Sequence, residues 1–187
     1  MTCRNCASPT CVDDCVPRLV QEPQAQVDLS GIPPSYHKHM KFLVVAQSVA
    51  SLSKDPSTKV GAVALDDRFN ILAVGFNGFP RGVDDNPVRY ADRELKLTLT
   101  SHAEQNLVAQ AAYSGHALAG STVILTALHP CTSCAKSLIQ AGVKVVLSPP
   151  PDAREHWVAE SKWAALLFEE AGVEVYHYRL EATSDPR

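Results

Sequence analysis

The chain has 187 residues, of which 45% are hydrophobic and 20% are charged, a composition that is ordinary for a globular protein and excludes gross disorder. Its length suits a single domain, since domains most often run about 100–150 residues. No apolar run reaches the roughly 18 residues that a membrane-spanning helix needs. The formal net charge of −3 argues against a protein that coats a long polyanion, because such proteins usually carry a basic excess.

The first 34 residues differ in composition from the rest, since they are rich in proline and hold Cys3, Cys6, Cys11 and Cys15. We interpret residues 1–34 as an irregular extension, residues 35–180 as one folded domain and residues 181–187 as a frayed tail. No charged-then-apolar leader is recognised at the N-terminus, so a cytoplasmic location is expected. Cysteines in that compartment bind metals more often than they form disulfides.

The predicted elements begin with a helix over 36–53, whose apolar side carries Met40, Leu43, Ala46, Val49 and Ala50. Strands over 61–65 and 71–75 follow, joined as a hairpin. The connection over 76–101 is long, with a short helix near 90–98. Loops of that length in a compact domain are often functional.

The second half alternates helices with buried strands. Helices are expected over 101–113, 131–141 and 153–171, and strands over 121–127, 143–147 and 173–178. This order predicts an α/β layered fold. The 153–171 helix is long enough for a right-handed crossover, so the last two strands should be parallel.

Two short segments carry the residues best suited to chemistry, and each lies at the start of a predicted helix. They are His102-Ala103-Glu104 and Pro130-Cys131-Thr132-Ser133-Cys134. Cys131 and Cys134 share one side of a first helical turn, where partial positive charge favours thiolates. Two thiolates and one imidazole leave the fourth position of a tetrahedral zinc site open, which is the catalytic arrangement. Glu104 could then move protons to and from a water without binding the metal.

Either segment alone is a weak signal, because an isolated Cys-x-x-Cys is often structural or redox-active. Together and in this order, His-x-Glu and Pro-Cys-x-x-Cys form the signature of zinc nucleobase deaminases. The chain resembles the cytidine and deoxycytidylate deaminase family over roughly residues 36–180. The strings Ser53–Ala62, Gly75–Gly82 and Pro130–Gly142 resemble those of the branch that acts on deoxycytidylate (dCMP).

The resemblance implies a three-layer cytidine-deaminase-like fold, with a five-stranded mixed sheet between helices, usually within a homo-oligomer. It implies that residues 35–180 form the catalytic domain. The implied reaction is hydrolytic deamination of dCMP to dUMP and ammonia, which feeds thymidylate synthesis. Control by dCTP and dTTP is common in the family, and Asp84–Thr100 is where an effector contact would be sought. No membrane partner is expected, and nucleic acid is disfavoured by the charge.

The resemblance also assigns roles to individual residues. It implies one catalytic Zn²⁺ held by His102, Cys131 and Cys134, with Glu104 as the proton shuttle. In addition, it implies that Asn77 binds the deoxyribose and that the backbone N–H of Ala103 binds the pyrimidine O2.

A monophosphate substrate needs cations or hydrogen-bond donors beyond the sugar. The loop strings beside the predicted site offer Lys54, Lys59 and Arg81 together with the hydroxyls of Ser53, Ser57 and Thr58. Solvated surface charge is the alternative, because most lysines and arginines are exposed. Phe76, Phe79 and Tyr90 could stack on the base, although core packing is the more common role. His129 could line the pocket or be an ordinary loop histidine.

The N-terminal set Cys3-x2-Cys6-x4-Cys11-x3-Cys15 comes close to the spacing of a zinc knuckle. Four thiolates would make a second, closed and structural zinc site, and the alternative is four spare thiols. Two other functions stay open. The chain could deaminate a modified deoxycytidylate or another cytosine nucleoside or nucleotide, or it could be a nucleic-acid-binding module that uses the knuckle.

Overall fold

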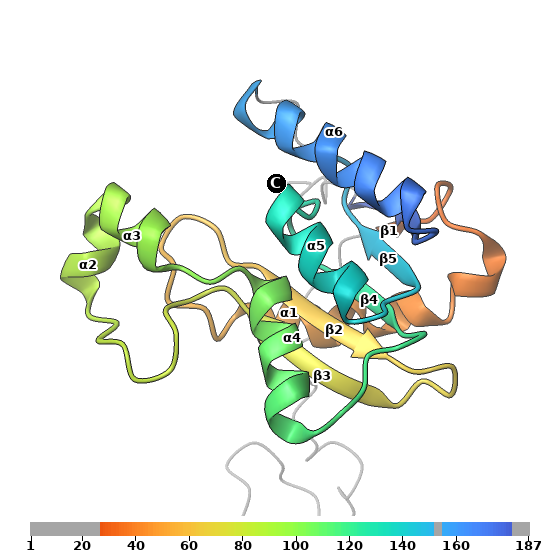
Figure 1. Ribbon diagram of the computed structural model, residues 1–187, viewed down its shortest axis with the longest axis horizontal. Coiled ribbons are helices and arrows are strands. Elements are labelled where there is room, and N and C mark those ends of the chain that lie inside the picture. The colour runs from red at the N-terminus through yellow and green to blue at the C-terminus, as the bar shows by residue number, and fades with distance from the viewer. Residues whose placement is uncertain (1–26, 152–154, 181–187) are drawn as a thin grey trace, which may run out of the picture.

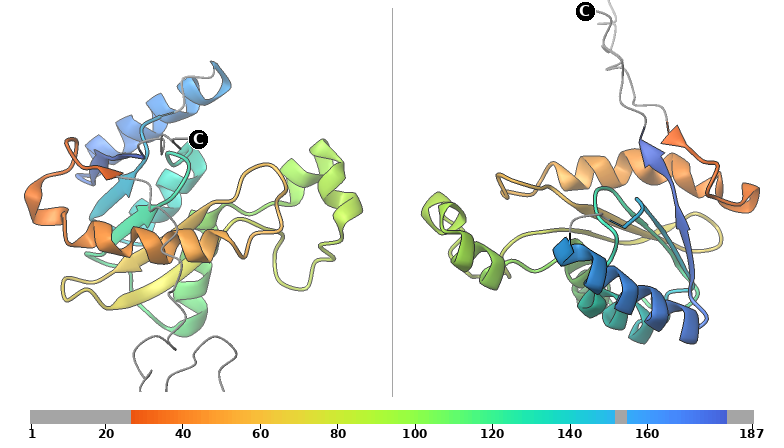
Figure 2. Two further views of the ribbon diagram at one scale, coloured as in Figure 1. Left: turned by 180° about the vertical axis from the view of Figure 1, so that it is seen from behind. Right: turned by 90° about the horizontal axis from the view of Figure 1, so that it is seen from above.

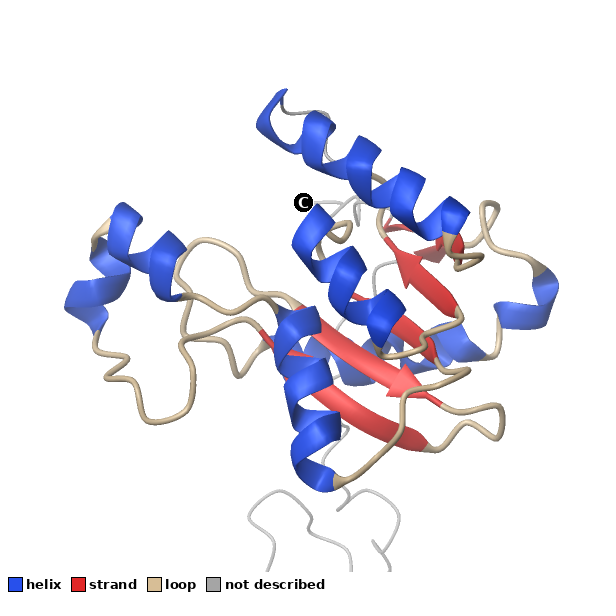
Figure 3. Cartoon of the chain, in the orientation of Figure 1, coloured by secondary structure: helices blue, strands red, loops and turns tan. Residues whose placement is uncertain are grey.

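The computed structural model describes residues 27–151 and 155–180, and the predicted cysteine knuckle and the C-terminal tail lie outside these ranges. A five-stranded sheet in the order β3-β2-β4-β5-β6 forms the centre of the fold (Figures 1 and 3). Its strands are β2 (Gly61–Leu65), β3 (Ile71–Phe76), β4 (Thr122–Leu125), β5 (Val145–Ser148) and β6 (Glu174–His177). β2 runs antiparallel to β3 and β4, whereas β4, β5 and β6 are mutually parallel. The predicted mixed sheet with parallel last strands is therefore confirmed.

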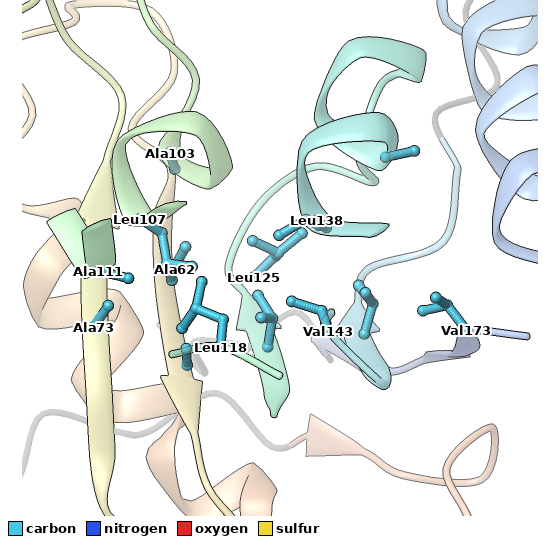
Figure 4. Packing of buried hydrophobic residues seen from close by; sticks show 14 of the residues in the cluster. Ala62, Ala73, Ala103, Leu107, Ala111, Leu118, Leu125, Leu138, Val143 and Val173 are labelled. Atoms are coloured by element: carbon cyan, nitrogen blue, oxygen red, sulfur yellow. The ribbon is translucent and has the colours of Figure 1, made fainter. Parts of the chain in front are cut away.

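Helices cover both faces of the sheet and make three layers (Figure 2). One face carries α4 (Ala103–Ser114), α5 (Thr132–Gln140) and α6 (Glu155–Glu170), and the other carries α1 (Leu43–Ala50). Because successive side chains of a strand point to opposite faces, β2 serves both cores. Ala62 (Figure 4) packs in the cluster under α4 and α5, as does Ala64, whereas Val63 and Leu65 pack in the cluster on the α1 side.

The first predicted helix is shorter in the structure than its apolar pattern indicated. Two 3₁₀ turns, η1 (Pro34–Tyr36) and η2 (His39–Phe42), precede α1. The N-cap residues of η2 and α1, Lys38 and Phe42, make no side-chain capping hydrogen bond, so neither supplies the local signal that favours the start of an α-helix. The apolar side is nevertheless buried as predicted, from Met40 to Ala50.

The long connection contains two short helices where one was predicted. α2 (Pro87–Ala91) and α3 (Arg93–Leu99) project from the body of the fold (Figure 1). Asp92 separates them, because its backbone is extended (φ −82°, ψ 113°) and its carboxylate accepts hydrogen bonds from the N–H groups of Glu94 and Leu95. This is the geometry of an N-cap, and it turns the chain so that α3 leads back toward residue 101.

A small two-stranded sheet was not predicted. β1 (Val27–Asp28) pairs antiparallel with β7 (Arg179–Leu180), and two residues are too few to show a periodic pattern. Ile32, which follows β1, is 3% exposed and packs in the α1-side core. Within the described ranges, every helix falls short of the length and apolarity that crossing a bilayer would require.

A glycine in β3 fixes how closely α4 approaches the sheet. A Cβ at Gly75 would collide with the carbonyl oxygen of Ala103 and lie 2.5 Å from the backbone nitrogen of Leu107. We therefore expect Gly75→Ala to push α4 outward and lower the free energy of unfolding by about 1–3 kcal/mol, the usual effect of overpacking. Urea denaturation of the purified variant measures this change.

Gly78→Ala is the matched control for that substitution, since its Cβ would meet nothing closer than 3.9 Å. It should unfold within about 0.5 kcal/mol of the parent, as substitutions without a named clash usually do. Equal midpoints for the Gly75 variant and the parent would mean that α4 does not depend on this close approach.

Candidate metal centre

The first turns of α4 and α5 meet at the edge of the sheet where β3, β4, β5 and β6 end. His102 is the N-cap of α4 and Cys131 is the N-cap of α5, and both have extended backbone. The His102 N–H donates to Oε1 of Gln105 at 3.0 Å, so the side chain three residues into α4 satisfies the N-cap backbone. Both side chains consequently lie at helix N-termini, where the backbone favours negative charge.

The structure brings the three predicted metal ligands together. Nδ1 of His102 lies 3.5 Å from Sγ of Cys131 and 3.3 Å from Sγ of Cys134. All three ligand atoms lie within 4.8 Å of one another. A tetrahedral ion with Zn–S bonds of about 2.3 Å and Zn–N bonds of about 2.0 Å separates sulfur from nitrogen by roughly 3.5 Å, so the observed spacing fits zinc.

The charges of the three groups also call for a cation. The hydrogen bond from Cys134 lowers the pKa of Cys131 to about 4, and the hydrogen bond to Cys131 raises the pKa of His102. The pKa of Cys134 is raised, because its thiol is hydrogen-bonded to Cys131 and because it is buried. Two adjacent thiols do not both lose their protons readily, because the two thiolates would repel each other. A bound dication stabilises both thiolates. The donor set therefore fits Zn²⁺.

Glu104 lies one position beyond the first residue of α4 and is only 5% exposed. Its burial raises the pKa of the carboxyl, so this group holds a proton more readily than an exposed glutamate does. Ala103 precedes it in the first turn, where backbone N–H groups have no intrahelical partner. One turn of helix thus places a free N–H beside a carboxyl group that can exchange protons.

A cavity of about 150 Å³ opens beside these residues. His102, Ala103, Glu104 and Cys131 line one end. The remaining polar wall is formed by Asp55, Thr58, Asn77, Lys96, Thr100 and His129.

Asn77, which the resemblance assigns to the deoxyribose, lines the cavity, and its side chain also makes hydrogen bonds within the cavity wall. Its Oδ1 accepts from the N–H of Val60 at 2.9 Å, and its Nδ2 donates to the carbonyl of Thr58 at 2.9 Å. Each end of the amide keeps one further hydrogen-bonding position, so a ligand contact is compatible with this role. Ser53 is buried behind it and donates to the carbonyl of Asn77 at 2.8 Å, which makes Ser53 part of the frame and not of the cavity wall.

The three basic residues that the sequence offers as phosphate ligands do not line this cavity. Lys54 has a 63% exposed side chain and pairs with Asp85 at 2.8 Å. Lys59 is exposed. The guanidinium of Arg81 lies 4.7 Å from the ring centroid of Tyr113. None of the three is among the described residues that line the cavity.

Lys96 is the basic residue that the sequence analysis missed. Its side chain is only 12% exposed, and its Nζ lies 3.2 Å from Oδ1 of Asp55 and 2.9 Å from Oγ of Ser57. The available signal was its spacing, since Lys96 and Thr100 are four apart on the segment that leads into His102, and such residues share one helical face. That segment had been considered only for an effector contact.

The predicted aromatic candidates pack against protein. Phe79 and Tyr90 stack on each other with ring centroids 4.4 Å apart, and Tyr90 is 7% exposed. Neither they nor Phe76 belong to the described cavity wall. The more common role, core packing, therefore accounts for Tyr90 and its partner.

His129 does line the cavity, two residues before Cys131. Its side chain is buried, and its Nδ1 lies 3.4 Å from Oγ of Ser148 at the end of β5. Burial lowers the pKa of its imidazole to about 4, with a smaller contribution from nearby His177. Its Nε2 is buried and has no hydrogen-bond partner within the part of the chain that the structure describes.

Comparison with known proteins places this geometry in a family. The family model named cytidine and deoxycytidylate deaminase zinc-binding region matches residues 36–148. The chain is 38% identical to an uncharacterized deaminase in the luxG 3′ region of Aliivibrio fischeri, over 72% of this chain and 89% of that protein. It is 36% identical to deoxycytidylate deaminase of Mus musculus, over 71% of this chain and 74% of the mouse protein.

Solved structures agree with the sequence comparisons. The dCMP deaminase of cyanophage S-TIM5, crystallised in complex with dCMP and dUMP, superposes with a TM-score of 0.57 at 27% identity. The match covers 77% of this chain and 97% of the phage chain. The chain therefore belongs to the cytidine and deoxycytidylate deaminase family, and it carries the His/Cys/Cys cluster and the buried glutamate on a three-layer fold.

Proposed function

We propose that this protein hydrolyses dCMP to dUMP and ammonia. The observation that carries the proposal is a cavity whose wall includes His102 and Cys131 of the His/Cys/Cys group, the buried Glu104, and Lys96, whose side chain is only 12% exposed. The relatives named deoxycytidylate deaminase and the phage enzyme that binds dCMP and dUMP support the same substrate.

The protein's own residues supply binding and proton transfer. His102, Cys131 and Cys134 would hold Zn²⁺, which when bound supplies Lewis-acid activation of the attacking water. The Glu104 carboxylate accepts a proton from that water and delivers it to N3 of the cytosine ring. The oxygen of that water bonds to C4, and Glu104 takes its remaining proton and passes it to the exocyclic nitrogen, which leaves as ammonia when the C4–N bond breaks. We expect the N–H of Ala103 to donate to the pyrimidine O2 and the Asn77 side chain to contact the sugar.

Lys96 is the residue we propose as the phosphate ligand. A lysine ammonium has three N–H donors, and Asp55 and Ser57 account for two of them. The third remains available to the cavity. The hydroxyl of Thr100, one turn further along, is buried without a hydrogen-bond partner among the described residues. An anionic group at this end of the cavity would receive donors from both side chains.

The substrate panel dCMP, CMP, deoxycytidine and 5-methyl-dCMP tests the proposed function directly. We expect dCMP to have the highest kcat/KM in an ammonia-release assay with the zinc-loaded protein. A preference for 5-methyl-dCMP or for deoxycytidine would favour the alternative of a modified or unphosphorylated substrate. Turnover of none of them would contradict the proposal.

The role of Lys96 is tested by removing its charge together with that of its partner. Lys96→Met alone would leave the buried carboxylate of Asp55 without its cation. The informative variant is therefore Lys96→Met/Asp55→Asn. Its asparagine keeps the Oδ1 that accepts from the N–H groups of Ser57 and Thr58. Since a hydrogen bond to a charged group contributes about 1.5–3 kcal/mol, KM for dCMP should rise roughly 10- to 100-fold. The kcat/KM for deoxycytidine should change little.

Two controls make this result specific. Asp55→Asn alone should keep most of the affinity for dCMP, because Lys96 is still present. Lys54→Met removes an exposed lysine from one of the loops whose sequence offers phosphate ligands. It should leave KM for dCMP unchanged. A rise in KM for Lys54→Met and none for the double variant would place the phosphate outside the cavity end that holds Lys96.

A homo-oligomeric state, control by dCTP or dTTP, and a second zinc at the N-terminal cysteines stay predictions from the sequence and its resemblance. Sedimentation analysis tests the first, and assays with added dCTP and dTTP test the second. Zinc content per chain tests the third.

A further inference from the structure

We infer that the Nε2 atom of His129 accepts a hydrogen bond from the 4-amino group of the substrate and thereby distinguishes substrate from product. This inference rests on the proposed function and adds a specificity-determining side chain to it. The observation behind it is a buried ring nitrogen in the cavity wall that has no hydrogen-bond partner among the residues that the structure describes. A buried polar atom without a partner costs free energy, so a ligand that supplies the partner is favoured.

The hydrogen bonds around Ser148 favour a proton on Nδ1 of His129. The Ser148 hydroxyl donates to the carbonyl of Pro149 at 3.0 Å, so its oxygen is left as an acceptor. Nδ1 of His129 lies 3.4 Å from this oxygen and Nδ1 of His177 lies 3.5 Å from it, and both are placed to donate. In a neutral imidazole only one nitrogen is protonated. Nε2 of His129 is therefore an acceptor with a free lone pair.

His129 lines the same cavity as His102, Glu104 and Cys131. His129 is two residues from Cys131 and is joined to it through Pro130, whereas Lys96 and Thr100 belong to the wall formed by α3 and the residue that follows it. In the proposed reaction the carbon that is attacked is C4, which must face the zinc ligands. The group attached to C4 is the amino group, so we expect it to be the part of the base that His129 contacts.

Substrate and product present opposite chemistry to such an acceptor. The 4-amino group of dCMP is a donor and pairs with a lone pair on Nε2. The 4-oxo group of dUMP is an acceptor and would face that lone pair without a proton between them. The same side chain should therefore bind substrate and disfavour product, which lowers product inhibition.

Direct binding measurements test the inference apart from turnover. In a Glu104→Gln host, which should hold dCMP unreacted, isothermal titration calorimetry gives Kd for dCMP and for dUMP. Adding His129→Phe keeps a ring of similar size and removes both nitrogens. We expect the ratio of Kd for dUMP to Kd for dCMP to fall about three- to tenfold, the effect of one neutral hydrogen bond. His129→Gln, which restores an acceptor, should recover much of the ratio.

His177→Phe is the matched control, since its ring contacts His129 at a centroid distance of 5.3 Å without lining the cavity. It should leave the ratio unchanged. In hosts with Glu104 intact, His129→Phe should also lower Ki for dUMP relative to KM for dCMP. An unchanged ratio in His129→Phe, with both nucleotides still bound, overturns the inference and leaves the proposed function standing. Failure of the host to bind either nucleotide overturns the proposed function, and the inference with it.

Discussion

Glu104→Gln is expected to lower kcat for dCMP by about 10²- to 10⁴-fold, the usual contribution of a positioned acid–base group. The glutamate is 5% exposed and lies in the first turn of the helix that His102 caps. Glutamine has the same shape and can keep the local hydrogen bonds, but its amide cannot carry a proton between water and the base. Affinity for dUMP and zinc content should therefore stay near those of the parent.

Three measurements on the same preparation separate this outcome from misfolding. They are the rate of ammonia release, the Kd for dUMP and the zinc content per chain. Glu94→Gln, an exposed glutamate in the first turn of α3, is the control and should retain full activity. If Glu104→Gln turned over dCMP as fast as the parent, the buried carboxyl would not be the proton shuttle. The hypothesis of a binding module on a deaminase scaffold would then gain support.

The sheet and the helices that frame the site could be predicted because their signals are local. The apolar strings of β4 and β5 lie within short windows of sequence, and so do Gly142 and Gly172, the glycines that follow α5 and α6. The metal ligands follow from spacing, since Cys131 and Cys134 share a helical turn. By contrast, β1 and β7 depend on a pairing between residues 27–28 and 179–180, which no window of sequence contains.

The cavity wall was harder to predict for a related reason. Lys54 and Lys59 flank the predicted site in sequence, yet the chain turns their side chains to the surface. Lys96 lies far from Asp55 in sequence, and only the return of α3 to the body brings the two within 3.2 Å. Burial of a charge against a specific partner is a property of tertiary packing, so a residue of this kind becomes visible only in the fold.

Cys134→Ala is expected to abolish deamination and to remove one zinc per chain relative to the parent. Cys134 is fully buried, and its sulfur lies 3.3 Å from Nδ1 of His102. Losing it leaves two protein ligands, too few for the three-ligand site that catalytic zinc requires. Because the metal binds only the folded state, its loss should also lower Tm.

The size of this fall in Tm follows from linkage. A ligand present at about 1,000 times its Kd adds about 4 kcal/mol, and each kcal/mol shifts Tm by about 2–4 °C in a chain of this size, so a fall of roughly 8–16 °C is expected. A chelator should lower the Tm of the parent. It should remove no further zinc from the catalytic site of the variant, because that site is already without its ion. Ser133→Ala, in the same turn, is the control and should keep the zinc. The comparison measures a difference of one zinc per chain, so it holds whether or not the N-terminal cysteines bind a second ion. Equal zinc contents in parent and variant would exclude Cys134 as a ligand.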